Sequence, residues 1–307
     1  MKRLEKGIAV VGSTTIDEIV ENDRSIFKLG GVTAYSGLTY RRHGINTLIV
    51  SNLAHQDVAI LNKLYEENIA VFREESTHTT RFVNYIKGDS RSQELPQQAG
   101  PIQAAQIHAV LDQVDGLHLG PLHPLDIEWE AAGLLHNSNR MIFLDVQGLT
   151  RMLKNQQVYT SISEHTERAL SIAHIVKANG AEYSAVRDFY HMGPAELMRK
   201  FNIRELVVTL GEKGGFVQNQ NGAAFHYQAK MIEVPVDPTG AGDVFFAAYL
   251  VSRFSAGKEI PDACRYAAQI AARQVEGQYI TADTLSLSGW QRTENRRQRT
   301  EGRGPRF

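Results

Sequence analysis

The sequence has little of what would mark a secreted, membrane-bound or strongly charged protein. Cys264 is the only cysteine among 307 residues, so no disulfide can form within the chain. No apolar run approaches the roughly 20 residues that cross a bilayer, and the basic N-terminus leads into a short strand-like run rather than a signal-peptide core. A formal net charge of −1 gives no overall field that attracts nucleic acid or a membrane surface. We therefore expect a cytoplasmic protein with no membrane partner.

Common ligand-binding motifs are also missing. Neither glycine-rich nucleotide fingerprint, G-x-x-x-x-G-K-[ST] or G-x-G-x-x-G, occurs, which disfavours P-loop kinases and Rossmann oxidoreductases. The 11 histidines show no spacing typical of a metal site; His118 and His123, for example, flank a Gly-Pro turn. A bound zinc ion is therefore not expected.

Apolar residues are plentiful, at 42% of the chain, and their pattern predicts the fold class. Short continuous apolar runs alternate with amphipathic stretches, as in a mostly parallel sheet covered by helices on both faces. We predict strands over 7–11, 46–51, 116–119, 140–145, 174–177 and 205–209. We predict helices over 32–43, 57–67, 125–136 and 194–201.

Two regions have the pattern of antiparallel strands. Asn221-Gly222 lies between strand-like runs at 214–218 and 223–228, and Asn-Gly between such runs is a strong hairpin signal. Polar and apolar residues alternate over 79–87, and a Gly-Asp turn leads on to a further strand-like run. With neighbouring insertions this region would form a small separate sheet, although an edge hairpin of the main sheet is the alternative. The segments of this second sheet are 17–20, 25–29, 79–87 and 91–95.

The most informative stretch is the heptapeptide D-P-T-G-A-G-D at 237–243, which opens into an apolar helical segment at 244–251. A Gly-Ala-Gly turn at a helix start leaves backbone N–H groups without intrahelical partners, and together with the helix dipole they form an anion site. Asp243 places a carboxylate where an anion would bind. This suits a base that takes a proton from a hydroxyl attacking a phosphoryl group. An ordinary helix start with a first-turn acid is the alternative.

The heptapeptide resembles the C-terminal signature of the ribokinase-like (PfkB) family of carbohydrate and nucleoside kinases, usually D-[TP]-x-G-A-G-D. The resemblance implies a three-layer α/β/α fold with a central mostly parallel sheet and a small β-sheet lid. The kinase domain would span 1–289, with the lid built from insertions near 13–30 and 78–96. The implied activity is ATP- and Mg²⁺-dependent phosphorylation of a hydroxyl of a sugar or sugar-like polyol. The implied catalytic residues are the general base Asp243 together with Gly240, Ala241 and Gly242. The helix N-terminus at 240–243 would be the anion hole, with the N–H groups of Ala241, Gly242 and Asp243 as its donors.

Two further segments are similar to the donor-binding motifs of the family. Asn179-Gly-Ala-Glu182 matches N-x-x-E, whose Glu orders Mg²⁺ through its water shell while the Asn reaches toward the phosphates. Read alone, Asn179 is a helix N-cap. The segment that starts at Thr209 matches the T-L-G-x-x-G motif, which lines the nucleotide in the family. The alternative is that these glycines only form a tight connection between two strands. The resemblance thus assigns Mg²⁺ to Glu182 through water, and ATP to Asn179, Thr209, Gly211, Gly214 and, from a small-residue helix, Tyr266.

The segments expected to bind the acceptor also resemble motifs of the family, but one motif residue is replaced. Asp17 follows the first strand at the place of the substrate-binding Asp, where a carboxylate can accept bonds from two hydroxyls, although a plain turn residue is the alternative. Gly30-Gly31 matches the start of a G-G-x-x-x-N motif whose N–H groups meet the acceptor. Tyr35 replaces the Asn, and an aromatic ring there suits a nucleobase or a cyclitol. Arg91 is a candidate cation over the acceptor or the transferred phosphate, unless it is an exposed hairpin charge.

Several alternatives stay open at this stage. Within the family, the aromatic residue at position 35 favours a nucleoside kinase. A non-catalytic nucleotide- or sugar-binding regulatory protein on the same fold would have no need of Asp243. The Arg-rich tail at 290–307 is expected to be a solvated end, although such tails can bind nucleic acid. In the family, the lid often pairs two subunits, so a homodimer through the lid is a further expectation.

Overall fold

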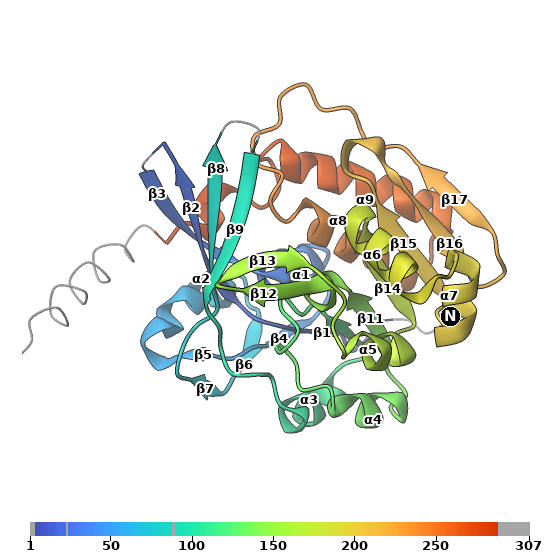
Figure 1. The fold of residues 1–307 in the computed structure, drawn as a ribbon, viewed down its shortest axis with the longest axis horizontal. Helices are drawn as coiled ribbons and strands as arrows, with labels where there is room; N and C mark the ends of the chain where they lie inside the picture. The colour runs from blue at the N-terminus through green and yellow to red at the C-terminus, as the bar shows by residue number, and fades with distance from the viewer. Residues whose placement is uncertain (1–3, 23, 88–89, 288–307) are drawn as a thin grey trace, which may run out of the picture.

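The computed structural model describes residues 4–22, 24–87 and 90–287 (Figure 1). Within these residues a nine-stranded sheet has the order β17-β16-β15-β14-β11-β10-β1-β4-β6, and a six-stranded sheet has the order β12-β13-β9-β8-β2-β3. A short pair, β5 (Leu53–Ala54) and β7 (Glu75–Ser76), completes the strands. No described helix is long and apolar enough to cross a membrane.

The strands of the larger sheet are parallel from β6 through β15, and β16 and β17 complete the sheet in antiparallel pairing. The predicted fold class and the terminal hairpin are therefore confirmed. The strands are β1 (Ile8–Val11), β4 (Thr47–Val50), β6 (Ala70–Phe72), β10 (Gly116–Leu119), β11 (Met141–Asp145), β14 (Ile175–Asn179), β15 (Glu205–Thr209), β16 (Gly215–Asn219) and β17 (Ala224–Tyr227).

Helices cover both faces of this sheet, which explains why its central strands are apolar at nearly every position. Successive side chains of a strand point to opposite faces. Accordingly, Ile8 and Val10 of β1 belong to one core and Ala9 and Val11 to the other. The first core includes residues of α1 (Val32–Arg42), α8 (Ala241–Leu250) and α9 (Ile260–Val275). The second includes residues of α3 (Ala104–Val110), α4 (Ala131–His136), α5 (Thr166–Ile172), α6 (Gly180–Tyr190) and α7 (Pro194–Phe201).

The smaller sheet stands beside the larger one in Figure 1. All four segments predicted for it are strands, and they belong to one sheet separate from the main one. A further hairpin, β12–β13, was not predicted and extends this sheet next to β9. The strands are β2 (Thr15–Glu21), β3 (Arg24–Gly30), β8 (Arg81–Lys87), β9 (Ser90–Gln97), β12 (Arg151–Lys154) and β13 (Gln157–Thr160).

Two predicted helices are only partly present. The segment predicted at 57–67 is a 3₁₀ helix (His55–Leu61) followed by the short α2 (Asn62–Glu66). The segment predicted at 125–136 becomes helical only at Ala131, because Ile102 exchanges backbone hydrogen bonds with Asp126 and Glu128 and holds this stretch extended. The chain also forms a π-helical turn (Val251–Ser255) and α10 (Ala282–Leu285). The Arg-rich tail at 290–307 lies outside the described residues.

Candidate active site

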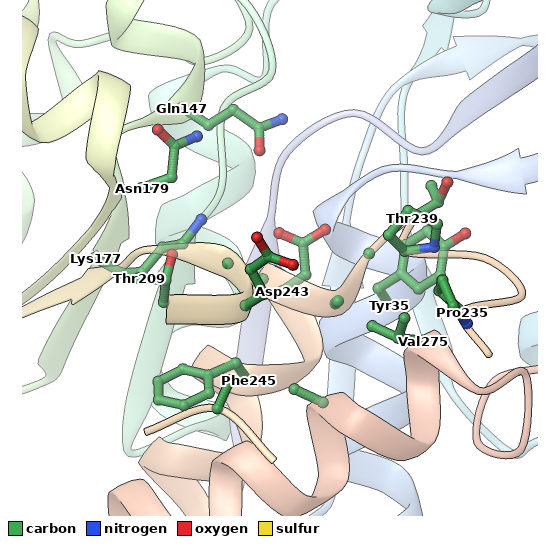
Figure 2. Close-up of a pocket in the computed structure, with 18 of the residues that line it drawn as sticks. Tyr35, Gln147, Lys177, Asn179, Thr209, Pro235, Thr239, Asp243, Phe245 and Val275 are labelled. Carbon is green, nitrogen blue, oxygen red and sulfur yellow. The ribbon is translucent and has the colours of Figure 1, made fainter. Parts of the chain in front are cut away.

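A cavity of about 1220 Å³ is lined by residues of both sheets and of the N-terminus of α8. Ligand sites of open α/β sheets lie at the carboxyl ends of the strands. Asn179 and Thr209 are the last residues of β14 and β15, and both line this cavity. Figure 2 shows Asn179, Gln147 and Lys177 on one side of Asp243, with Tyr35 and other lining residues on the opposite side.

The first turn of α8 places backbone donors and a carboxylate on the cavity wall. Gly240 is the N-cap in the left-handed conformation (φ 73°), and a Cβ there would overlap the ring of Tyr35. The N–H of Ala241 donates to the Pro238 carbonyl at 3.2 Å. The N–H groups of Gly242 and Asp243 have no protein acceptor among the described residues. Within this turn, the N–H groups of Gly242 and Asp243 are therefore the backbone donors left for an anion.

Asp243 is surrounded by charged side chains that determine its acidity. Burial raises the pKa of Asp243 to about 7. The negative charges of Asp145 and Glu182 raise this pKa further, whereas the positive charges of Lys177 and Arg151 lower it. A carboxyl group with a pKa near neutrality matches the requirement for a general base at physiological pH.

Beside Asp243 lies a buried ion pair between two neighbouring strands. The Nζ of Lys177 on β14 is 2.8 Å from Oδ2 of Asp145 on β11, and both side chains are almost fully buried. Oδ1 of Asp145 accepts the N–H of Gln147 at 3.1 Å. Burial opposes a charge on Lys177, but Asp145, Glu182 and Asp243 together raise its pKa above the ordinary value. Sequence reasoning missed this cation, because a lysine at the end of an apolar run carries no motif.

The N-x-x-E segment forms a helix cap and also reaches the cavity. The side chain of Asn179 accepts the N–H groups of Ala181 and Glu182, each at 2.9 Å, and so caps α6. Both carboxylate oxygens of Glu182 accept bonds from Asn179, from its backbone N–H and its side-chain amide. Asn179 lines the cavity, whereas Glu182 is not among the lining residues and is buried next to it.

The carboxylates at this end of the cavity fit a hydrated magnesium ion. Burial raises the pKa of Glu182; Asp145 reinforces this rise, and Lys177 opposes it. Within the described part of the chain, no three His, Cys, Asp or Glu side chains are grouped to hold a metal by themselves. Magnesium typically keeps several waters and binds one or two carboxylates together with substrate phosphates. Glu182 could hold such an ion through water, as the motif implies.

The donor end of the cavity combines glycines with an apolar wall. Thr209, Gly211 and Gly214 all line it, and Gly211 and Gly214 have positive φ values of 61° and 82°. The wall of α9 consists of small residues spaced three and four apart, which places them on one helix face. The apolar lining residues here are Ala268, Ala271, Ala272 and Val275 of α9, with Met231, Ile232 and Pro235 of the loop before α8.

Tyr266 does not line the cavity. Its hydroxyl is 2.7 Å from Nε2 of His43, the C-cap residue of α1, and the two rings pack edge to face. On α9 it lies on a different face from Ala268 and Ala272. The structure therefore brings the small residues of this helix to the cavity but not its tyrosine.

The acceptor end holds Asp17, Gly31 and Tyr35. Oδ1 of Asp17 accepts the hydroxyl of Thr15 at 2.6 Å. Gly31 is the N-cap of α1 with a φ of 90°. Gly30 does not line the cavity, but a Cβ at this position would overlap the Asp17 carboxylate, so the glycine leaves room for that side chain.

Lys28 connects the smaller sheet to the start of α8. It lies opposite Asp17 in the β2–β3 pairing, and its Nζ is 2.9 Å from Oδ2 of Asp237. Oδ1 of Asp237 accepts the N–H of Thr239 at 2.9 Å, one residue before the N-cap Gly240. Burial works against ionisation of Asp237, but the bonds from Thr239 and Lys28 lower its pKa overall.

A second unpredicted cation comes from the hairpin β12–β13. Arg151 lines the cavity, donates from Nη1 to the Leu122 carbonyl at 3.0 Å, and lies 5.6 Å from the centre of the Phe82 ring. It was missed because the hairpin itself was not recognised. Arg91, the predicted cation, lies on β9 opposite Ile86, and its side chain falls outside the described residues.

Comparison with known proteins finds a matching family model and a curated protein that is similar over part of the chain. A model of the pfkB family of carbohydrate kinases matches residues 8–285. Among curated proteins, the bifunctional protein HldE of Stutzerimonas stutzeri (strain A1501) is 40% identical over 88 residues. That match covers 29% of this chain and 18% of HldE, so the chain spans less than a fifth of this relative.

Two solved structures share the fold at low sequence identity. A pyrophosphate-dependent kinase in the ribokinase family, complexed with a pyrophosphate analog and myo-inositol, superposes with a TM-score of 0.77 at 19% identity, covering 88% of this chain and 95% of that one. Arabidopsis thaliana ribokinase complexed with ribose and ATP superposes with a TM-score of 0.71 at 18% identity, covering 93% and 96%.

Proposed function

The chain belongs to the pfkB family of carbohydrate kinases, and we propose that it transfers the γ-phosphoryl group of ATP to a hydroxyl of a sugar or sugar-like polyol. The observation that carries this proposal is the arrangement at the start of α8. There, Asp243 shares one cavity with Asp17 and with two N–H groups that find no acceptor in the described part of the chain.

In this mechanism the chain positions the acceptor and receives its proton. Asp17 accepts hydrogen bonds from hydroxyls of the acceptor, and the N-terminus of α1 at Gly31 supplies backbone donors. The reacting hydroxyl gives its proton to Asp243 as its oxygen attacks the γ-phosphorus. The bond from that phosphorus to the bridging oxygen breaks, and ADP leaves. The N–H groups of Gly242 and Asp243 stabilise the charge on the transferred group.

Magnesium would be held at the phosphate end of the cavity through Glu182 and its water shell. When bound, it neutralises phosphate charge and helps to orient the triphosphate. Asn179 bonds this carboxylate and lines the cavity, which supports a role for its amide in binding a phosphate oxygen.

The acceptor end favours a polyol over a nucleoside. Tyr35 is only 3% exposed and its ring packs on Gly240, which leaves little of its face for stacking on a nucleobase. Amide side chains that both donate and accept hydrogen bonds also line the cavity, as expected for a ring with several hydroxyls. These amides are Asn84, Gln93 and Gln147.

Pyrophosphate is a second candidate donor, because one structural neighbour binds an analog of it. The apolar wall formed by α9 and the loop before α8 favours ATP, since pyrophosphate has no apolar part to bury there. The two donors can be compared in one assay.

The test is product formation with ATP or pyrophosphate, Mg²⁺ and a panel of sugars, cyclitols and nucleosides. We expect turnover with ATP on one polyol class, and a loss of about 10²- to 10⁴-fold in Asp243→Asn. Asp262→Asn, which changes an exposed acid on α9, is the matched control and keeps full activity. Nucleotide binding without turnover on any acceptor would instead favour a regulatory binding protein.

A further inference from the structure

A buried carboxylate near the acceptor end of the cavity has no part in the proposed reaction. Asp126 is 2% exposed and accepts three hydrogen bonds from two segments of the chain. Its Oδ2 accepts the N–H of Ser13 at 3.2 Å and the N–H of Leu122 at 2.8 Å. Its Oδ1 accepts the hydroxyl of Ser13 at 2.5 Å. Because buried backbone N–H groups need acceptors, this one side chain fixes how the two segments lie together.

The two segments leave neighbouring strands at the edge of the sheet where the cavity lies. Ser13 follows β1 and Leu122 follows β10, and these two strands pair in parallel. The carboxyl ends of parallel strands meet at one edge of a sheet, where α/β proteins bind their ligands. Asp126 thus joins two loops of the ligand-binding edge, although it does not itself line the cavity.

The loop after β1 supports the N-terminus of α1. The Ser13 carbonyl accepts the hydroxyl of Thr33, in the first turn of α1, at 3.2 Å. A Cβ at Gly31 would overlap the same carbonyl, so the glycine backbone packs directly on it. Gly31 lines the cavity at its acceptor end. In a closely packed interior, a shift of Ser13 would therefore move the N-terminus of α1 as well.

The loop after β10 supports side chains of the cavity wall. Leu122 lines the cavity, and its backbone is held on both sides, with its N–H on Asp126 and its carbonyl on Nη1 of Arg151 at 3.0 Å. The preceding carbonyl, of Pro121, accepts the N–H of Gly148 at 2.9 Å. Arg151 lines the cavity, so a shift of Leu122 would move a guanidinium group of the cavity wall.

An ion pair with His123 does not explain why Asp126 is buried here. Nε2 of His123 is 3.8 Å from Oδ1 of Asp126, and neither ring nitrogen has a hydrogen-bond partner in the described part of the chain. Burial lowers the pKa of His123, an effect that Asp126 opposes and Arg151 reinforces, so the ring is neutral at neutral pH. The bonds from Ser13 and Leu122 are therefore the interactions that orient the Asp126 carboxylate.

Building on the proposed function, we propose that Asp126 is a positioning residue for the acceptor. Through Ser13 it seats the N-terminus of α1, and through Leu122 it holds Arg151 in the cavity wall. Its loss displaces the acceptor from the transferred phosphoryl group, and a displacement of about 1 Å can cost about 100-fold. The donor-binding strands β14 and β15 are separated from β10 by β11, so the donor is affected far less.

Steady-state kinetics of Asp126→Ala separate positioning from stability, with the polyol that the wild type phosphorylates as the probe. We expect KM for this acceptor to rise about 10- to 100-fold, while KM for ATP changes less than about 2-fold. A variant that is only less stable contains fewer folded molecules, so its apparent kcat falls but neither KM changes. An acceptor KM equal to that of the wild type would overturn the proposal.

Asp115→Ala is the matched control, because Asp115 lies just before β10, at the opposite end of the same strand. Its carboxylate is also buried, and its Oδ2 accepts a backbone N–H, that of Lys6, at 2.6 Å. We expect this variant to lose stability with no change in the acceptor KM. An equal rise of the acceptor KM in both variants would contradict a specific role of Asp126.

Two milder variants keep the proposal testable if Asp126→Ala does not fold. Ser13→Ala removes only the hydroxyl bond to Asp126 and should raise the acceptor KM about 3- to 10-fold. Asp126→Asn can place its amide oxygen where Oδ2 accepts both N–H groups, so its acceptor KM should stay within about 3-fold of the wild type. An unchanged acceptor KM in Ser13→Ala would count against the proposal in the same way as in Asp126→Ala.

Hydrogen exchange tests the support of the two loops without any turnover. In Asp126→Ala, peptides covering 12–16, 30–34 and 120–124 should exchange about 10-fold faster or more, whereas Asp115→Ala leaves them unchanged. Unchanged exchange in these peptides would overturn the role of Asp126. If the exchange difference is found but the wild type phosphorylates no polyol, the proposed function falls, while the support of these loops by Asp126 stands.

Discussion

Replacing Asp243 with Asn should lower turnover by about 10²- to 10⁴-fold and at the same time stabilise the fold at neutral pH. Burial raises the pKa of this carboxyl from 3.8 to about 7, so the folded protein holds the proton more tightly than the unfolded chain does. Stability from this group is therefore fully present below about pH 4 and is lost as the pH rises toward 7. Above pH 7 the folded state contains a carboxylate that burial disfavours.

The size of the effect follows from the two pKa values. At 1.36 kcal/mol per pH unit, the difference between 3.8 and about 7 corresponds to at most about 4 kcal/mol. We expect Asp243→Asn to raise the free energy of unfolding by about 1–3 kcal/mol at about pH 8, because the amide is itself polar and buried. Near pH 5.5 the advantage should fall to roughly half.

The assay is urea unfolding of the wild type and Asp243→Asn at both pH values, with circular dichroism as the probe. Asp262→Asn serves as the control, because its carboxylate is exposed and its removal should change little. If Asp243→Asn were less stable than the wild type near pH 8, or if its advantage grew as the pH fell, the reasoning about burial would be refuted.

Three further predictions concern the support of the site. Gly240→Ala places a Cβ on a residue in the left-handed conformation and against the Tyr35 ring. Urea unfolding should therefore show a loss of about 2–4 kcal/mol in the free energy of unfolding. A loss below about 1 kcal/mol would contradict this packing. Lys28→Met leaves Asp237 without its ion pair, so we expect kcat to fall about 10-fold and the free energy of unfolding to fall by about 1–2 kcal/mol. An unchanged kcat would show that the start of α8 does not depend on this contact. Glu182→Gln should raise the Mg²⁺ concentration for half-maximal activity by about 10- to 100-fold, and an unchanged metal titration would remove Glu182 from the magnesium site.

Where local signals agreed, the sequence was sufficient to predict structural elements to the residue. Helix α7 begins with Pro194 after a Gly193 N-cap and ends before Asn202 in the left-handed conformation, so both ends are marked in the sequence. Strand β15 has the predicted bounds, Glu205–Thr209, around the apolar residues 206–208. Both elements have the expected type because periodicity, caps and burial all favour the same structure.

The hairpin β12–β13 was missed because it lacks the usual turn chemistry. Its turn residues, Asn155 and Gln156, both have positive φ, a conformation usually given to Asn-Gly or Gly-Gly. Lys177 was missed for another reason: its importance depends on Asp145 and Asp243, which are distant in sequence and meet only in the folded protein. The motif residues Asp17, Asn179, Thr209 and Asp243, in contrast, lie on one cavity, although their roles remain predictions.

The most direct test of the central claim is transfer of label from γ-labelled ATP to an acceptor, followed by isolation of the product. We expect a phosphorylated polyol in stoichiometric amount with ADP, dependent on Mg²⁺ and lost in Asp243→Asn. Its rate should fall as the pH drops below about 7, where the base becomes protonated. Labelled product formed at an undiminished rate by Asp243→Asn would contradict the assignment of the base. Label found only in inorganic phosphate, with every acceptor, would contradict the assignment as a polyol kinase.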